Sequence, residues 1–262
     1  MQIGTAIILG SGTSNGCPSL GFDYPDAFLD NPKNWRTRPS LLVQGPAGNF
    51  LVDAGPELRL QLLRERITEV DSVLITHTHA DHIMGMDDLR CFEQRMNKQM
   101  AIYAQPHDQE VLRRVFSYAF GQFPPGVHVP RFDLRDVPPV LDVVGLTVET
   151  MIVMHGPTPV VGIRIGDFAY LTDVNFIPED ARAKLQNLDV LVIDAVRRTP
   201  HPNHFHFEAA IEEVGRLSPR MAYFTHLSHD YDHDITEATE LPPHIRLCYD
   251  GIKLPINTAQ SR

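Results

Sequence analysis

One short stretch, residues 73–85, constrains this chain more than any other. It reads VLITHTHADHIMG and places His77, His79, Asp81 and His82 directly after an apolar run. These side chains are costly to bury and poor at continuing a strand or a helix, and loops seldom use histidine this densely. Imidazole and carboxylate together suit zinc, manganese or iron. A polar loop without metal is the alternative, and the density of ligand groups favours the metal site.

Four groups cannot complete two metal sites, so the stretch predicts further ligands downstream. Three isolated residues stand just after apolar runs, namely His155 after TVETMIVM, Asp173 after FAYLT and His226 after MAYFT. Each alone is more often an ordinary polar residue at the end of a strand. Together they favour the metal interpretation, and a carboxylate such as Asp173 can bridge two ions, which neutral imidazole cannot do.

Alternating antiparallel strands and helices indicate two sheets with helices outside them, folded as one α/β domain over residues 1–262. The sequence VVGIRIGDFAYLTD predicts a hairpin that turns at Gly166-Asp167. A Pro- and Gly-rich segment, 120–139, is expected to be a long surface loop. Strands are expected at 5–9, 40–44, 50–53, 72–76, 100–103, 146–153, 160–165, 168–172, 190–194, 221–225 and 245–249, and helices at 56–67, 83–96, 107–118, 178–188 and 207–217.

The charge balance bears on the partners. The formal net charge of −10, with no basic stripe, disfavours a surface that grips nucleic-acid polymers. Three cysteines with no close pair make a disulfide framework improbable. The N-terminal stretch lacks the basic segment of a signal peptide, and no apolar run approaches the ~20 residues of a membrane-spanning helix. A cytoplasmic protein that does not enter the membrane is therefore expected.

The order of these motifs resembles the metallo-β-lactamase fold superfamily, whose members carry Thr-His-x-His-x-Asp-His, then a lone His, a bridging Asp and a final His. The resemblance implies a four-layer αββα sandwich with a two-metal site at one edge. Asp53 in FLVDAG matches the family's buried aspartate that supports the metal loop. By matching position, one ion would be held by His77, His79 and His155, the second by Asp81, His82 and His226, and Asp173 would bridge them.

The reaction depends on the branch of the superfamily. Asp173 argues against the lactamase branch, where that position is usually cysteine. His204 stands 22 positions before His226, which resembles the transfer-RNA 3′-processing nucleases and the cyclic-phosphate phosphodiesterases of phosphonate breakdown. In those families a histidine at this interval contacts the phosphate and assists the leaving group. His206, two residues further along, is an alternative candidate for this role, and His201 is less favoured than either.

Similarity to the cyclic-phosphate branch covers roughly residues 3–255, including LGSGTSNGCPSLG, NPKNWRTRPSLLV and LVIDAVRR. One departure is clear. Relatives often carry a cysteine cluster that binds a structural zinc with a histidine, but Phe22, Tyr24 and Ala27 stand here, and His229 has lost those partners. The structural metal is expected to be absent. The basic insertion by which transfer-RNA nucleases clamp their substrate is also missing.

These observations predict a binuclear metallohydrolase that uses two divalent ions, zinc or manganese, and a bridging hydroxide to cleave a small anionic phosphodiester, cyclic phosphates included. His204, Asp81 and Asp173 are the expected catalytic residues. No nucleic-acid polymer is expected as a partner. The relatives are often homodimers, although no exposed apolar helix face in this sequence points to one. The alternatives are a glyoxalase-type thioester hydrolase, a non-catalytic metal- or ligand-binding protein, and a relative of the proteins that make pyrroloquinoline quinone.

Overall fold

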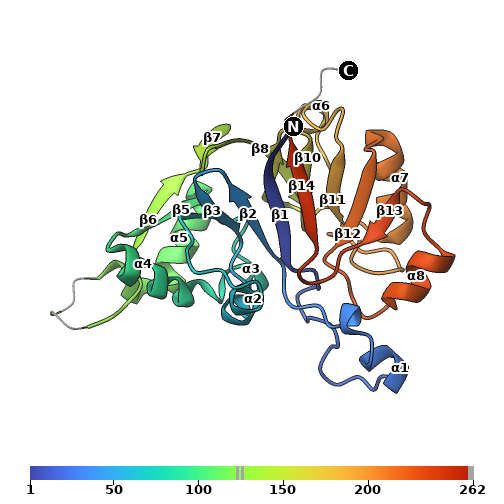
Figure 1. Cartoon of the computed structure of the whole chain (residues 1–262), viewed down its shortest axis with the longest axis horizontal. Helices are drawn as coiled ribbons and strands as arrows, with labels where there is room; N and C mark the ends of the chain where they lie inside the picture. The colour runs from blue at the N-terminus through green and yellow to red at the C-terminus, as the bar shows by residue number, and fades with distance from the viewer. Residues whose placement is uncertain (122–123, 125–126, 259–262) are drawn as a thin grey trace.

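Two seven-stranded sheets form the centre of the molecule (Figure 1). The computed structural model describes residues 1–121, 124 and 127–258. The first sheet has the order β14-β1-β2-β3-β4-β5-β6 and the second the order β13-β12-β11-β10-β9-β8-β7. Their strands are β1 (Gln2–Gly10), β2 (Ser40–Gly45), β3 (Gly48–Val52), β4 (Ser72–Leu74), β5 (Met100–Ala104), β6 (Phe132–Asp136), β7 (Val140–Val143), β8 (Leu146–His155), β9 (Thr158–Ile165), β10 (Phe168–Leu171), β11 (Val190–Asp194), β12 (Met221–Thr225), β13 (Ile245–Leu247) and β14 (Lys253–Asn257).

Helices cover the outer faces of both sheets (Figure 1). The helices on the side of the first sheet are α2 (Leu58–Arg64), α3 (Ala80–Ile83), α4 (Arg90–Met96) and α5 (Pro106–Val115). Those on the side of the second sheet are α6 (Glu179–Ala183), α7 (Phe207–Leu217) and α8 (His233–Thr239). A short α1 (Asp26–Leu29) lies in the connection from β1 to β2, and one-turn 3-10 helices span Pro32–Asn34, Met86–Leu89 and Ser117–Phe120.

Three separate apolar clusters show that the fold has four layers. One cluster contains Ile8 and Phe50 of the first sheet together with Ile163 of the second, so it lies between the sheets. A second joins Leu51 to Leu58 and Leu112 of the helices over the first sheet. A third joins Leu191 to Ala181 and Val214 of the helices over the second sheet. Each sheet thus buries both faces, and the predicted αββα sandwich is confirmed.

The direction of the strands determines where the site forms. Strands β3 to β6 are mutually parallel, and so are β10 to β13. Because β8 and β10 both pair antiparallel with β9, β8 runs in the same direction as β10. Residues that follow these strands therefore collect at one edge of each sheet, which is where ligand and catalytic groups gather in parallel sheets.

The predicted hairpin at Gly166-Asp167 is present, with Ile165 paired to Phe168. The prediction of a loop over 120–139 is wrong in part, because β6 forms there, while 122–123 and 125–126 lie outside the described residues. Strand β6 is an edge strand with charged exposed residues, so it lacks the apolar pattern of a buried strand. Strands β7 and β14 were not predicted either.

Within the described part of the chain, no helix is long and apolar enough to cross a membrane.

Candidate metal centre

The first sheet contributes the HTHADH segment. His77 and His79 lie between β4 and α3, and Asp81 and His82 lie within α3. The short helix turns Asp81 and His82 back toward the sheet edge, and His82 is fully buried.

The second sheet contributes the three isolated residues. His155 is the last residue of β8, Asp173 lies just beyond β10, and His226 directly follows β12. All three are at most 3% exposed although they are polar. The structure thus brings the seven predicted ligands to one place. In the sequence they are spread over the 150 positions from 77 to 226.

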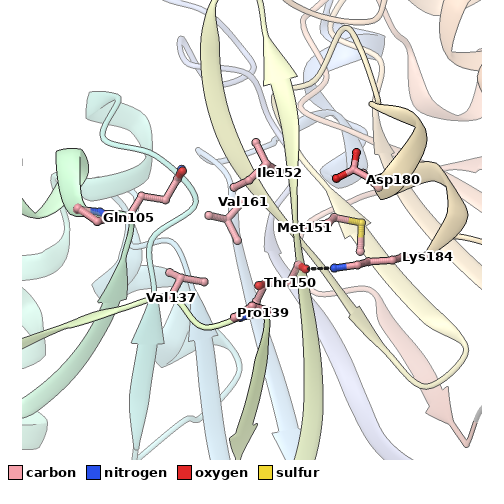
Figure 2. Close-up of a pocket in the computed structure, with 11 residues that line it drawn as sticks. Gln105, Val137, Pro139, Thr150, Met151, Ile152, Val161, Asp180 and Lys184 are labelled. Carbon is pink, nitrogen blue, oxygen red and sulfur yellow. Dashed lines mark hydrogen bonds between the residues drawn. The ribbon is translucent and has the colours of Figure 1, made fainter.

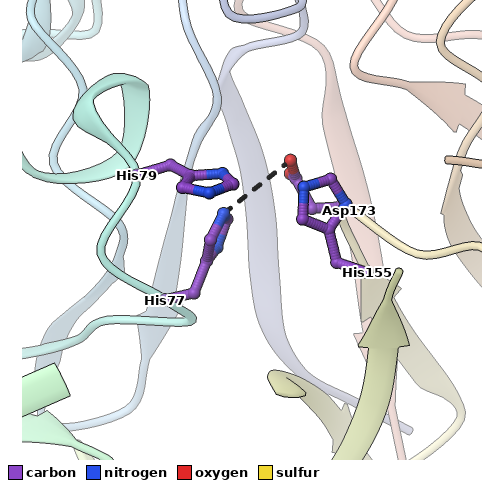
Figure 3. A group of neighbouring side chains, drawn as sticks. All are labelled: His77, His79, His155 and Asp173. Carbon is purple, nitrogen blue, oxygen red and sulfur yellow. Dashed lines mark ion pairs between the residues drawn. The ribbon is translucent and has the colours of Figure 1, made fainter. Parts of the chain in front are cut away.

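These side chains form two groups that share one residue. The first is His77, His79, His155 and Asp173, drawn in Figure 3, and the second is Asp81, His82, Asp173 and His226. Within each group one ligand atom per residue lies within 4.8 Å of the others. Asp173 Oδ1 is 3.9 Å from His77 Nε2 and 3.3 Å from His226 Nε2. Asp173 Oδ2 is 3.1 Å from His82 Nε2, so the carboxylate faces both groups.

Unpaired buried atoms show that the groups fit metal ions. His77 Nε2, His82 Nε2, both ring nitrogens of His226 and Asp81 Oδ2 are buried and make no hydrogen bond of good geometry among the described residues. The Nε2 atoms instead face Asp173 and Asp81 oxygens at 3.1 to 3.9 Å. Buried polar atoms nearly always have partners, so a set of orphans facing one space needs a ligand. Divalent cations accept such nitrogen and oxygen donors.

Neighbouring groups fix which ring nitrogen faces the centre. His82 Nδ1 donates to Asp53 Oδ2 at 2.7 Å, and Asp53 also accepts from Thr76 N and Thr76 Oγ1, each at 2.8 Å. His155 Nδ1 donates to the carbonyl oxygen of Asn203 at 2.8 Å. In both histidines the Nε2 lone pair is therefore left for a metal, which is the usual way such ligands are oriented.

Backbone conformation also directs the site. Asp53, Asp173 and His226 each follow a strand and have φ of 62°, 52° and 61°. Left-handed backbone is uncommon for residues other than glycine, and it collects at functional sites where the surrounding fold holds it in place. The chain turns sharply at these three points and presents each side chain to the shared edge.

Charges within the centre shift the ionisation of its members. Burial and the neighbouring His82 lower the pKa of His77 well below its usual range. Burial alone would also lower the pKa of His226, but Asp173 and Asp81 raise it to about 9. Likewise Asp173, Asp81 and Asp53 outweigh burial and raise the pKa of His82 well above its usual range. In the absence of metal, His82 and His226 of the second group are therefore protonated, and these protons occupy nitrogen positions that a metal ion would take.

His204 lies beside both groups. Its ring centre is 4.4 Å from that of His155 and 4.8 Å from that of His226. His204 Nδ1 donates to Asp194 Oδ2 at 2.6 Å, which leaves Nε2 for a ligand. His206 instead directly precedes α7 at its N-cap position, with its Nε2 3.6 Å from Glu208 Oε2. The sequence did not single out Asp194 as the partner of His204, although its place at the end of β11 resembles the positions of Asp53 and Asp173.

Two recesses differ in their relation to this centre. A cavity of about 500 Å³ borders His204 and is lined largely by polar residues of the segments 13–19, 196–204 and 228–230. A second recess of about 340 Å³ lies against the middle of β8, between Gln105 and Lys184 (Figure 2). Lys184 Nζ there donates to the carbonyl oxygen of Thr150 at 2.9 Å, and none of the seven candidate ligands lines it. None of the seven lines the polar cavity either, but His204 does, and its ring contacts those of His155 and His226, so the polar cavity is the recess that adjoins the candidate centre.

Aromatic rings occupy the place where relatives carry the cysteine cluster. The ring centres of Phe22 and His229 are 4.4 Å apart, and Tyr24 stacks on Phe28 at 5.1 Å. The buried guanidinium of Arg36 also ties this region together, since Nη1 donates to Ser228 O and Nη2 to Tyr231 O at 3.1 and 2.8 Å. Ring packing and hydrogen bonds thus hold this loop among the described residues. The absence of a structural metal stays a prediction.

The four layers, the strand order and the two histidine-aspartate groups at one edge define a metallo-β-lactamase fold with clusters suited to metal ions. Residues 48–227 match the β-lactamase superfamily domain, and the chain belongs to this family.

Two relatives match nearly the whole chain. A solved structure of a new diphosphatase from the PhnP family has a TM-score of 0.90 and 35% identity, covering 99% of this chain and 100% of that one. This likeness confirms the predicted resemblance to the cyclic-phosphate branch. The chain is also 36% identical, over 96% of its length, to an octanoyltransferase of Porphyromonas gingivalis, of which the match covers 51%.

A more distant relative, a ribonuclease Z of Bradyrhizobium diazoefficiens, is 28% identical over 48% of this chain and 43% of its own length. The chain thus spans about half the length of the curated relatives it matches.

Proposed function

We propose that this chain, with residues 1–262 acting as one domain, is a binuclear metal-dependent hydrolase of a small phosphodiester. The observation that carries the proposal is the pair of ligand groups that share Asp173, with His204 beside both. Asp173 favours this reaction over lactam hydrolysis. The net charge of −10 favours a small substrate over a nucleic-acid polymer.

The proposed ligand assignment follows the two groups. His77, His79 and His155 would hold one divalent ion, Asp81, His82 and His226 the second, and Asp173 would contact both. Two such ions, zinc or manganese, would supply an activated water and positive charge that offsets the charge developing on the phosphate oxygens. Asp53 keeps His82 in the required tautomer, since its Oδ2 accepts from His82 Nδ1 at 2.7 Å.

His204 would act on the leaving group. With Nδ1 donating to Asp194, a proton on Nε2 makes the ring an imidazolium, and the adjacent carboxylate stabilises that charge. Nε2 then can bind a phosphate oxygen or deliver its proton to the departing alkoxide. Asp194 is itself fixed, because its Oδ2 also accepts from Val174 N at 3.0 Å. The pair supports a proton donor held in one orientation.

A second candidate is hydrolysis of a diphosphate, which the 35% identical PhnP-family diphosphatase favours. The same ions and donor would serve an anhydride. The decisive experiment measures steady-state hydrolysis of bis(p-nitrophenyl) phosphate, a nucleoside diphosphate and a glutathione thioester by the metal-loaded chain. The proposal expects turnover of the phosphodiester. Turnover of the thioester alone would support a glyoxalase-type enzyme, and no turnover would support a binding protein.

Metal binding should release protons. Since the pKa of His226 is raised to about 9, its ring is protonated at pH 7.5 and must lose a proton before it can coordinate a metal. Zinc titrated calorimetrically into chelator-stripped protein should thus give heats that depend on the buffer's ionisation enthalpy. Apparent affinity should fall as the pH falls. His226→Asn should release on the order of one proton fewer, and buffer-independent heats would contradict the assignment.

The metal content should be two ions per chain, both in the candidate centre. A tetrahedral structural zinc needs four Cys, His or carboxylate ligands, and Phe22 and Ala27 cannot coordinate. Elemental analysis should give two ions for the wild type and for His229→Ala, and fewer for Asp173→Ala. A third, tightly held zinc that disappears in His229→Ala would show that other ligands around Phe22 and His229 form a structural zinc site.

A further inference from the structure

The polar cavity beside His204 holds a second histidine that the proposed chemistry does not use. His201 lines this cavity, and its ring centre is 4.7 Å from that of His204. It belongs to neither ligand group of the metal centre. The other walls include Ser14, Asn15 and Ser19 from the loop after β1, and Ser228 after β12.

The hydrogen bonds of His201 fix its tautomer. Its Nδ1 accepts from the backbone N–H of Asn203 at 3.1 Å, so this nitrogen carries no proton. A neutral ring must then carry its proton on Nε2, which becomes a hydrogen-bond donor. Burial, together with His204 and Arg197, lowers the pKa of His201 to about 4, so the ring stays neutral at physiological pH.

The segment that carries His201 is rigid. Prolines at 200 and 202 restrict the backbone on both sides of the histidine. The carbonyl oxygen of Pro202 accepts from Asn175 Nδ2, and that of Asn203 accepts from His155 Nδ1, each at 2.8 Å. The position of His201 is thus tied to that of a proposed metal ligand, which pre-organises its donor relative to the reacting phosphate.

We propose that His201 is a specificity-determining residue whose Nε2–H binds an oxygen on the organic group of the substrate, beyond the phosphate. Since His204 would protonate the leaving oxygen and borders the same cavity, the group held there is the leaving alcohol. Serine hydroxyls and the Asn15 amide add donors and acceptors. The cavity therefore fits a small, oxygen-bearing alcohol such as a polyol or sugar, and disfavours an alkyl group of the same size. This inference rests on the proposed phosphodiesterase activity.

The test compares two diesters of equal size, methyl 3-hydroxypropyl phosphate and methyl butyl phosphate, with methyl phosphate measured by chromatography. The metal-loaded wild type should prefer the hydroxyl-bearing diester by roughly 10-fold in kcat/KM, the effect of a donor left unpaired by the alkyl analogue. His201→Ala should reduce this ratio several-fold, mainly through KM. His201→Gln, which keeps an N–H donor, should restore part of it. The two diesters differ in intrinsic reactivity, but this difference is the same for every protein variant. It therefore cancels when the kcat/KM ratio of a variant is compared with that of the wild type.

His206→Ala is the matched control, because this histidine does not line the cavity, and it should leave the ratio unchanged. Equal losses of kcat/KM on both diesters in His201→Ala would indicate that His201 contacts the phosphate, and would overturn its proposed role in specificity. No preference in the wild type would overturn the proposed subsite. Failure of the wild type to cleave either diester, or any phosphodiester, would instead refute the proposed function.

Discussion

Replacing Asp173 with alanine should remove at least one metal ion and nearly all hydrolysis while the chain still folds. Asp173 is the residue common to both ligand groups, with Oδ1 facing His77 and His226 and Oδ2 facing His82. Without it, the two cations would lose the one carboxylate that both groups share, and their less compensated repulsion would expel one. Metal content by elemental analysis and steady-state rates on the phosphodiester measure the two effects.

Asp173→Asn is the matched variant for this test. Asp173 has φ of 52°, and asparagine tolerates left-handed backbone better than alanine does. The asparagine variant should therefore keep the fold more fully than the alanine variant and still lose metal, because it lacks the negative charge. Two tightly held ions and full activity in either variant would refute the bridging assignment.

His204→Ala should keep both ions and lower kcat by roughly 10²- to 10⁴-fold, the usual contribution of a general acid or base. His204 Nδ1 is committed to Asp194, so the variant removes the Nε2 group next to the proposed leaving oxygen. Metal content should match the wild type, which separates this effect from the loss of a ligand.

His206→Ala is the comparison variant for the same experiment and should cost much less, since His206 lies at the start of α7 beside Glu208. Asp194→Asn should fall between the two in activity, because it keeps a hydrogen bond but loses the charge that stabilises the imidazolium. A larger loss for His206→Ala than for His204→Ala would show that the 22-residue interval to His226 pointed to the wrong histidine.

The clustering of the seven candidate ligands was largely predictable because these residues follow apolar strands, which are the strongest signal in a sequence. His155, Asp173 and His226 each stand at such a point, and parallel strands bring their ends together. The partnership of Asp194 with His204 was not predictable, since it joins a strand end to a loop whose path depends on tertiary packing. Edge strand β6 was missed because its exposed charges obscure the apolar pattern.

The ligand set is divided between the two sheets, and this division has a mechanical consequence. His77, His79, Asp81 and His82 follow β4 of the first sheet, whereas His155, Asp173 and His226 follow strands of the second. Neither half of the chain carries a complete set for either group. An ion bound by either group would therefore act as a cross-link between the halves. Separating the sheets would release it, so the free energy of metal binding would add directly to the resistance of the sandwich to coming apart.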